Sequence, residues 1–278
     1  MSKLEEVKEY FKIKAKDYDL VDQQLYWCLS DNLLWYALRK VVLDKFKGKE
    51  IKVFDAGGGT GRWLVKIMQY LENSKGLIYD ISEDMLSVAK DKIKKMNLEK
   101  RIMTINGNIE DMKNQKDSQY DIIICFHNVL GFVINPKKAF SEMTRVLKKD
   151  GYLVLVVPNK YHTLFFNIFM KRLHILDSIV QKNEGSFTDN MPSIHLYTPF
   201  SLRKTYGDSN FRNIKIFGFP VTIYPGVQET KITGNTDNIK EILSDSGTFK
   251  KIEEIERGLI LNEELAARGN NLLAVGQK

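Results

Sequence analysis

The chain has 278 residues, of which 43% are hydrophobic and 28% are charged, and its formal net charge is +7. This length and composition favour one globular domain over residues 1–278. No run of about 18 apolar residues and no signal peptide is present, so we predict a cytoplasmic protein without a membrane partner. Cys28 and Cys125 lie far apart and are predicted to be free thiols. No metal is expected, because the histidines are too scattered for a zinc site (His127, His162, His174 and His195).

The positive charge would suit an RNA partner, but its distribution argues against one. Much of the excess is lysine spread over a predicted helix surface, as at Lys90, Lys92 and Lys94. A surface that binds nucleic acid more typically carries a stripe of arginine and aromatic side chains. Charge alone therefore makes RNA the less favoured partner.

Residues 3–20 are expected to form an amphipathic helix with Tyr10 and Tyr18 on one face. Residues 20–42 are rich in aromatic side chains, and their apolar residues recur at helical spacing. Most of these side chains should be buried in the core, and others are expected to line a substrate pocket. We interpret residues 1–45 as an N-terminal helical cap.

A short apolar strand at residues 51–54 ends at Asp55 and passes into a glycine-rich turn and then a helix. Glycine lets the backbone turn tightly and approach a ligand, and the helix N-terminus offers free N–H groups. The pattern predicts a nucleotide-binding cradle, although a tight turn without a ligand would look the same. A dinucleotide fingerprint is excluded because Arg62 stands at its last position, and no P-loop triplet follows. The glycines occupy alternate positions (Gly57, Gly59 and Gly61).

The second predicted strand, residues 76–80, ends in an acid. Asp80 follows the glycines by about 20–25 residues, where nucleotide-binding folds have a ribose-binding carboxylate. A helix-capping or surface acid is the alternative interpretation. Ser82 is the predicted N-cap of the next helix, whose buried face includes Met85.

Two further strands are predicted at residues 101–106 and 120–126. The second is an almost continuous apolar run, as expected for a parallel strand that is covered on both faces. His127 follows it, at the carboxyl end where open α/β sheets carry out their ligand chemistry. His127 is therefore the candidate catalytic residue.

The remaining half of the chain continues the alternation with one interruption. A helix at residues 136–147 and a strand at residues 152–157 precede residues 158–198, which we interpret as an inserted lid. Thr198 is the expected N-cap of the helix that follows. The order of elements predicts a doubly wound α/β sheet. The closing strands and helices are expected at residues 212–224, 236–268 and 271–275.

The cradle motif Asp-x-Gly-x-Gly-x-Gly at residues 55–61 resembles motif I of the class I S-adenosylmethionine-dependent methyltransferases. Three further segments match that family in order. They are Tyr-Phe-x-x-x-Ala-x-x-Tyr-Asp at residues 10–19, Asp-x-Ser-x-x-Met-Leu at residues 80–86, and a helix, turn and strand at residues 140–157. The resemblance implies a mostly parallel, seven-stranded, Rossmann-like sheet and an S-adenosylmethionine-dependent methyltransferase activity.

The resemblance also implies a cofactor site. Tyr10 and Tyr18 would lie near the methionine end of S-adenosylmethionine, although simple helix packing explains them equally well. Asp80 would hold the ribose, and Met85 would lie against the adenine. The family usually has aspartate where this chain has Asn108, whose amide oxygen can still accept a bond from the adenine amino group. The expected cofactor-binding residues are Tyr10, Tyr18, Asp55, Gly57, Gly59, Asp80, Ile81, Met85, Asn108, Ile109 and His127.

The implied reaction is in-line attack by an acceptor atom on the sulfonium methyl group, with positioning providing most of the rate. A carboxylate acceptor needs no base, whereas a hydroxyl or ammonium group needs a proton acceptor. His127 is the best-placed candidate for that base. An orienting contact to cofactor or substrate is its alternative role.

The layout is nearest to that of the tRNA wobble-uridine methyltransferases that esterify a carboxymethoxy group. That family carries an arginine shortly before the Leu-Trp pair of the N-terminal helix, and here Ser30 precedes Leu34 and Trp35. Because of this departure we favour methyl transfer to an oxygen or nitrogen of a small-molecule metabolite. A tRNA-modifying methyltransferase and a non-catalytic adenosyl-binding protein are the alternatives. The sequence predicts neither the acceptor's identity nor an oligomeric state.

Overall fold

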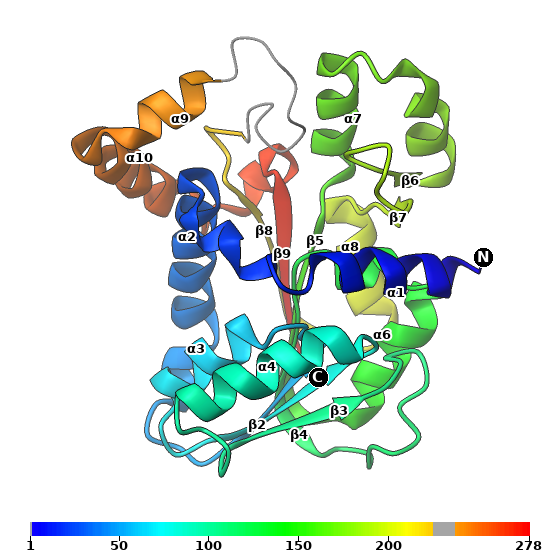
Figure 1. The fold of residues 1–278 in the computed structure, drawn as a ribbon, viewed down its shortest axis with the longest axis vertical. Coiled ribbons are helices and arrows are strands. Elements are labelled where there is room, and N and C mark those ends of the chain that lie inside the picture. The colour runs from blue at the N-terminus through cyan, green and yellow to red at the C-terminus, as the bar shows by residue number, and fades with distance from the viewer. Residues whose placement is uncertain (1, 225–236) are drawn as a thin grey trace.

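A seven-stranded sheet runs through the centre of the computed structural model, which describes residues 2–224 and 237–278 (Figure 1). Its strands are β1 (Lys52–Ala56), β2 (Lys75–Asp80), β3 (Ile102–Asn106), β4 (Tyr120–Cys125), β5 (Leu147–Pro158), β8 (Arg212–Phe219) and β9 (Asn271–Gln277). Their order is β3-β2-β1-β4-β5-β9-β8. The first five pair in parallel, and β9 is antiparallel to both of its neighbours. The predicted doubly wound, mostly parallel sheet is confirmed.

Helices cover both faces of the sheet and bury its apolar side chains (Figure 1). One face packs against α2 (Leu25–Val41), α3 (Arg62–Tyr70), α4 (Glu83–Lys95), α9 (Asp237–Ser244) and α10 (Ser246–Leu259). The other face packs against α6 (Pro136–Val146) and α8 (Pro199–Asp208). Short helical turns complete the chain at η2 (Leu43–Phe46), α5 (Val129–Phe132) and η6 (Glu263–Arg268).

Both N-caps that were predicted from the sequence are present at the starts of helices. The Ser82 hydroxyl accepts a hydrogen bond from the Met85 N–H at the start of α4. The Thr198 hydroxyl likewise accepts from the Ser201 N–H at the start of α8. Each side chain pairs one of the backbone N–H groups that a helix start leaves free. Both caps are thus confirmed.

The N-terminal region differs from the predicted single helix over residues 3–20. The first helix, α1 (Lys3–Lys14), ends early, and Tyr18 begins a separate 3₁₀ helix, η1 (Tyr18–Gln23). Tight bonds from the Ala15 and Asp17 N–H groups to carbonyls three residues back close the last turn. In Figure 1, α1 crosses one edge of the sheet, whereas α2 packs along it and buries Leu29 and Leu33 completely in the main core. The N-terminal cap over residues 1–45 stays a prediction.

The predicted lid region, residues 158–198, is folded as a small layer between β5 and α8. It contains α7 (Lys160–Phe169), the turns η3 (Leu173–Ile175) and η4 (Ser178–Lys182), and a two-stranded sheet of β6 (Glu184–Gly185) and β7 (Ile194–His195). Its apolar cluster includes Ile179, Ile194 and Leu196 together with Val7 of α1 and Phe132 of α5. This layer and α1 thus share one core. The interpretation of this layer as a lid stays a prediction.

Two strand boundaries depart from prediction. β8 ends at Phe219 rather than at residue 224, because Pro220 has no N–H with which to continue the ladder. β5 begins at Leu147, five residues earlier than expected, and its pairing with β4 is irregular between Tyr120 and Ile122. No helix within residues 2–224 and 237–278 is long and apolar enough to cross a membrane.

Candidate functional site

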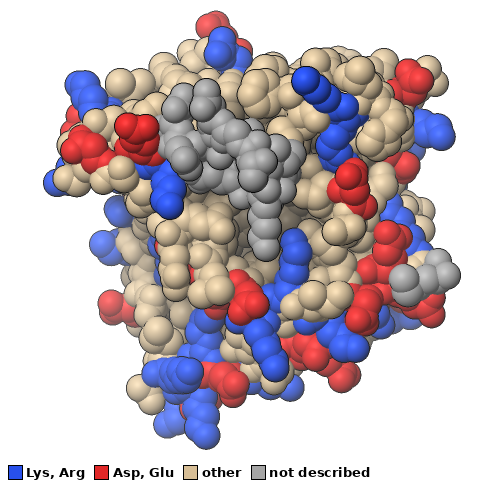
Figure 2. Space-filling view, turned by 45° about the horizontal axis from the view of Figure 1, so that its top comes forward, with Lys and Arg blue, Asp and Glu red and all other residues tan. Residues whose placement is uncertain are grey.

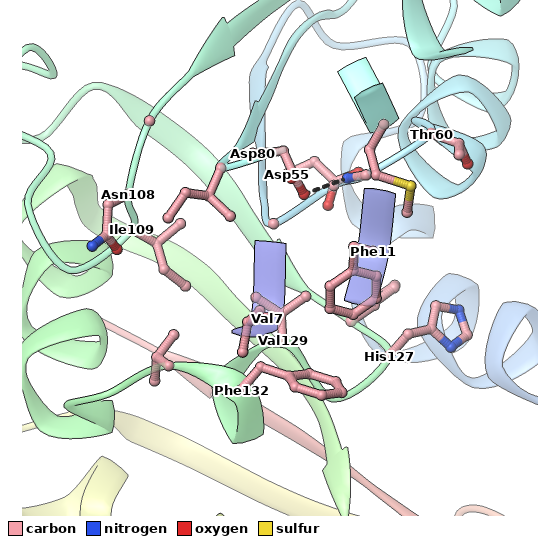
Figure 3. A pocket seen from close by; sticks show the side chains of 18 of the residues that line it. Val7, Phe11, Asp55, Thr60, Asp80, Asn108, Ile109, His127, Val129 and Phe132 are labelled. Carbon is pink, nitrogen blue, oxygen red and sulfur yellow. Dashed lines mark hydrogen bonds between the residues drawn. The ribbon is translucent and has the colours of Figure 1, made fainter. Parts of the chain in front are cut away.

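A cavity, partly open to solvent, lies at the carboxyl ends of β1, β2 and β4. The strand order reverses at β1, which lies between β2 and β4. Open α/β sheets bind ligands in the crevice at the carboxyl end of the strands at such a reversal. Figure 3 shows Asp55 and Asp80 on one side of the cavity, and Val7 and Phe132 on the other. Polar groups therefore come from the sheet edge, and an apolar wall comes from α1 and α5.

Two glycines of the turn have different roles: one leaves space in the cavity, and the other allows close packing beside it. Gly59 has a φ of +53°, and a Cβ there would lie 3.2 Å from the Met85 Cε and 4.0 Å from the Asp80 Oδ2. It would occupy the space between these two predicted site residues. Gly61 has a φ of +71°, and its Cβ would lie 2.5 Å from the Ile78 Cδ1. Gly59 thus leaves room for a ligand, whereas Gly61 allows α3 to begin close to β2.

Asp80 is fixed by backbone hydrogen bonds. Its Oδ2 accepts from the Gly59 N–H at 2.9 Å, and its Oδ1 accepts from the Ser82 N–H at 2.8 Å. Burial raises the pKa of this carboxyl, and the two backbone bonds oppose that shift. Each carboxylate oxygen retains a lone pair, so the group can accept two further bonds from a ligand.

Asp55 is the second carboxyl of the cavity, and it is incompletely paired. Its Oδ2 is buried and has no hydrogen-bond partner in the part of the chain that the structure describes. Burial, together with the nearby Asp80 carboxylate, raises the pKa of Asp55 to about 8. A buried polar atom without a partner is uncommon and calls for an explanation. A hydrogen-bond donor on a ligand would provide one.

Asn108 and Ile109 border the opposite end of the cavity, after β3 (Figure 3). The Asn108 Oδ1 accepts from the Glu110 N–H at 2.9 Å, which holds the side chain in a local turn. Glu110 in turn accepts from the Ile134 and Asn135 N–H groups at 3.2 and 2.7 Å. The chain after β3 is thereby tied to the start of α6, and the Asn108 amide oxygen retains one acceptor position.

His127 sits at a sharp turn after β4, with a φ of +51°. Its Nε2 accepts a hydrogen bond from the Trp63 Nε1 and lies 3.0 Å from the Arg62 Nη2. Burial, and then the Arg62 charge, lower the pKa of His127 to about 3. Since Nε2 is the acceptor, the ring hydrogen belongs on Nδ1, which no described residue contacts by a hydrogen bond. His127 is therefore a neutral, oriented imidazole.

Arg62 connects this histidine to the N-terminal region. Its Nη1 forms ion pairs with Asp31 of α2 and, at 2.5 Å, with Asp22 of η1. A second link joins Lys92 of α4 to Asp19 of η1 at 2.6 Å. The two links hold η1 against the glycine turn and its helices, so the cavity wall is built partly from long-range ion pairs.

The cavity brings together all the expected cofactor-binding residues except one. Tyr10 does not border it. Instead, the Tyr10 hydroxyl accepts from Lys14 at 2.5 Å, and its ring packs against Phe11 and Phe132. Phe11 faces the cavity in its place (Figure 3). The arrangement is compatible with the expected roles of the others, which stay predictions.

Most of the apolar wall and the partners of His127 were not predicted from the sequence. The spacing of Leu4, Val7 and Phe11 by three and four residues was the available signal for the face of α1 that borders the cavity. Arg62 and Trp63 had no local signal, because their contacts are made across the fold. The cavity residues not predicted are Leu4, Val7, Phe11, Gly58, Thr60, Arg62, Trp63, Gly107, Glu110, Phe126, Val129, Phe132 and Val133.

Comparison with known proteins agrees with this geometry. A family model described as "Methyltransferase domain" matches residues 47–199, more than half of the chain. The tRNA 5-carboxymethoxyuridine methyltransferase of Escherichia coli (strain K12) is 26% identical over 140 residues, which are 50% of this chain and 52% of that protein. The demethylmenaquinone methyltransferase of Bacteroides fragilis is 28% identical over 205 residues, covering 72% of this chain and 78% of that protein. The chain spans about half to two thirds of the first curated relatives that it matches.

A solved structure has the same fold along nearly the whole chain. It is an S-adenosylmethionine-dependent methyltransferase of Thermotoga maritima, described as a possible histamine N-methyltransferase. The TM-score is 0.56 at 15% identity, and the match covers 98% of this chain and 99% of that one. At this identity the likeness concerns the fold alone. Together with the family model and the glycine cradle, it shows that the chain belongs to the class I S-adenosylmethionine-dependent methyltransferase family.

Proposed function

We propose that this protein transfers the methyl group of S-adenosylmethionine to an oxygen or nitrogen atom of a small-molecule acceptor. The observation that carries the proposal is the cavity itself. It lies at the carboxyl ends of β1, β2 and β4, where open α/β sheets bind small ligands. Its walls are largely apolar, with a few carboxylate, amide and imidazole groups directed into it, as such sites require.

The residues around the cavity fit S-adenosylmethionine. Asp80 has acceptor positions for the two ribose hydroxyls, and Asn108 and Ile109 offer an amide oxygen and a backbone N–H to the adenine. The unpaired Asp55 Oδ2 would accept from the ammonium group of the methionine end. Gly59 leaves the space that a side chain would otherwise fill. When bound, the cofactor supplies an electrophilic methyl group on a sulfonium.

His127 is proposed to orient the acceptor rather than to remove its proton. A useful general base has a pKa near the working pH, whereas the pKa of His127 is about 3. Its Nε2 is also occupied by the hydrogen bond from Trp63. The Nδ1–H remains as a donor that could fix an acceptor's position.

This role of His127 narrows the acceptor class. Tyr18, another polar group of the cavity, has its pKa raised to about 12 by burial and is protonated at neutral pH. An acceptor that reacts without a dedicated base therefore fits best. A carboxylate is such an acceptor, because its oxygens have free lone pairs at neutral pH. An amine is another, because its minor uncharged form has a free lone pair on nitrogen.

A tRNA acceptor is the second candidate, supported by the Escherichia coli relative and by the net charge of +7. The visible surface argues against it. Figure 2 shows basic and acidic side chains interspersed on the face drawn, without a continuous basic stripe. The names of the two relatives indicate different acceptors, tRNA for one and demethylmenaquinone for the other. At 26% and 28% identity, neither acceptor can be assigned to this chain from its relative.

A transfer assay separates these possibilities. Purified protein is incubated with methyl-labelled S-adenosylmethionine and either a small-molecule extract or total tRNA from the same source. We expect label in the small-molecule fraction, and tRNA binding that disappears near about 150–200 mM salt. Label in tRNA with retained affinity at that salt would refute the small-molecule proposal. Cofactor binding without transfer to either pool would instead support a non-catalytic adenosyl-binding protein.

A further inference from the structure

The helix α7 exposes large apolar side chains to solvent. His162, Thr163, Phe166 and Asn167 are buried on its inner side. On the outer side, Phe165 is 54% exposed and Phe169 is 63% exposed. The exposed face of a surface helix is normally polar, and large exposed apolar patches usually mark a contact with another partner.

These exposed side chains form a continuous row on the helix. Tyr161, Phe165, Ile168 and Phe169 stand at positions i, i+4, i+7 and i+8, and are therefore on one face. The Phe165 and Phe169 rings are stacked, with 6.1 Å between their centroids. Leu173 of η3, one turn further along the chain, is exposed as well. We call Tyr161, Phe165, Ile168, Phe169 and Leu173 the α7 face.

The segment that carries the α7 face has a net positive charge, although its Arg172 is paired with Asp189. Residues 160–183 contain four basic residues and one acid, Asp177, so their net charge is 4 − 1 = +3. Lys171 and Lys182 are exposed and have no ion-pair partner among residues 2–224 and 237–278. In Figure 2 the upper right of the molecule, where α7 lies in Figure 1, is mainly uncharged, and both basic and acidic side chains lie around it. Such a surface complements an apolar layer that carries negative charge at its edge.

We propose that the α7 face docks on a lipid bilayer that contains anionic headgroups. A helix with aromatic and aliphatic side chains on one face and lysines beside it lies in the plane of the interface, with its apolar face among the headgroups and upper acyl chains. The long lysine side chains reach the phosphates while their stems remain in apolar surroundings. α7 has 10 residues and is therefore about 15 Å long, a length suited to lying on a bilayer and too short to span one.

The docking surface is connected to the cavity by packing. The layer that carries α7 shares an apolar cluster with Val7 and Phe132, and both of these residues border the cavity. Docking would therefore bring the apolar wall of the cavity close to the bilayer. The proposal does not depend on the acceptor: it concerns a surface outside the cavity and has its own assay.

Vesicle co-sedimentation tests the proposal on the full chain. One set of vesicles contains equal amounts of phosphatidylcholine and phosphatidylglycerol, and the other contains phosphatidylcholine alone. We expect the protein to bind the anionic vesicles and to bind the neutral ones several-fold more weakly. Phe165→Ser/Phe169→Ser should lower the partition coefficient at least about tenfold, because two partly exposed aromatic groups no longer enter the interface. Lys171→Gln/Lys182→Gln should lower it about fivefold per lysine on anionic vesicles only.

Matched variants at the opposite end of the molecule serve as controls (Figure 1). Met96→Ser/Met103→Ser removes two exposed apolar side chains from the α4 and β3 region, Met103 being 66% exposed. Lys94→Gln/Lys95→Gln gives the same net charge as the lysine variant of the α7 face. Both controls should bind vesicles as the unmodified protein does. Calorimetric binding of S-adenosylmethionine, measured for every variant, reports separately on the fold and on the proposed function.

Three results would overturn the proposal. The unmodified protein could fail to bind anionic vesicles, or the control variants could lose binding as strongly as the α7-face variants. Light scattering without lipid could show an oligomer that Phe165→Ser/Phe169→Ser converts to a monomer, which would identify the α7 face as a contact between copies of the chain. Hydrogen exchange adds a direct readout, since residues 161–169 should become protected when anionic vesicles are added.

Discussion

Replacing Asp80 by alanine should weaken S-adenosylmethionine binding far more than it weakens the fold. The carboxylate offers two acceptor positions to the ligand beyond its bonds to the Gly59 and Ser82 N–H groups. Hydrogen bonds to a charged group contribute about 1.5–3 kcal/mol, so the dissociation constant should rise roughly 10- to 150-fold. Calorimetric titration measures this change directly.

The same substitution leaves two backbone N–H groups without their partner, which costs about 1–3 kcal/mol. Burial opposes the charged form of Asp80, however, and raises its pKa, so part of that cost is regained when the carboxylate is removed. Thermal unfolding of the ligand-free protein measures the remainder. Asp84→Ala is the matched control, because Asp84 is an exposed acid in the first turn of the same helix and does not border the cavity. A folded Asp80→Ala protein whose dissociation constant stays within about threefold of the original would refute the ribose assignment.

The further predictions concern the other residues of the site and the segments beside it. His127→Ala should lower turnover while leaving cofactor affinity nearly unchanged, and turnover should show no ionisation between about pH 5 and 8 that this variant removes, because the pKa of His127 is about 3. Such an ionisation, if seen in a pH–rate profile, would identify His127 as a base. The pKa of Asp55 is about 8 in the ligand-free protein and should fall beside a bound ammonium, so binding at pH 7 should release protons, detectable by calorimetry in buffers of different ionisation enthalpy and abolished by Asp55→Asn. Since the unfolded state loses this proton near pH 4, the contribution of Asp55 to stability should decline as the pH rises from about 4 to 8, and Asp55→Asn should flatten that decline in thermal unfolding. Arg62→Met should destabilise the protein by about 3 kcal/mol because Asp31 is left buried without its cation, and Arg62→Met/Asp31→Asn should restore part of the loss; equal unfolding temperatures for the single variant and the original would contradict this. Saturating cofactor should slow hydrogen exchange in residues 3–14 and 160–198, whereas unchanged exchange in both segments would count against closure of a lid.

The sheet and the glycine cradle could be predicted because their signals are local. Strand, turn and helix follow one another within residues 51–71, and the alternate glycines stand at the turn between them. Asp80 was identifiable for the same reason, since it ends β2 next to a recognisable N-cap, Ser82. Buried parallel strands such as β4 are also evident as continuous apolar runs. These features depend on residues that are neighbours in the chain.

The residues of the apolar wall that α1 contributes to the cavity were evident only from the tertiary structure. The chain turns at residues 15–17, which ends α1 before Tyr18 and leaves Phe11, rather than Tyr10, at the cavity. Helical spacing specifies which residues share a face, but it does not specify where the helix ends or which of two adjacent aromatic rings points inward.

The chemistry of His127 depends on the fold to an even greater degree. From the sequence both a base and an orienting group were open, because its position after β4 says nothing about its surroundings. Folding brings Trp63 and Arg62, more than 60 residues earlier in the chain, onto its Nε2, and Asp31 holds Arg62 in place. Burial and an adjacent positive charge both disfavour the imidazolium, and each arises only when segments far apart in the chain pack together. The local pattern therefore predicted the position of the cavity, whereas long-range packing determined the surroundings of the histidine that borders it.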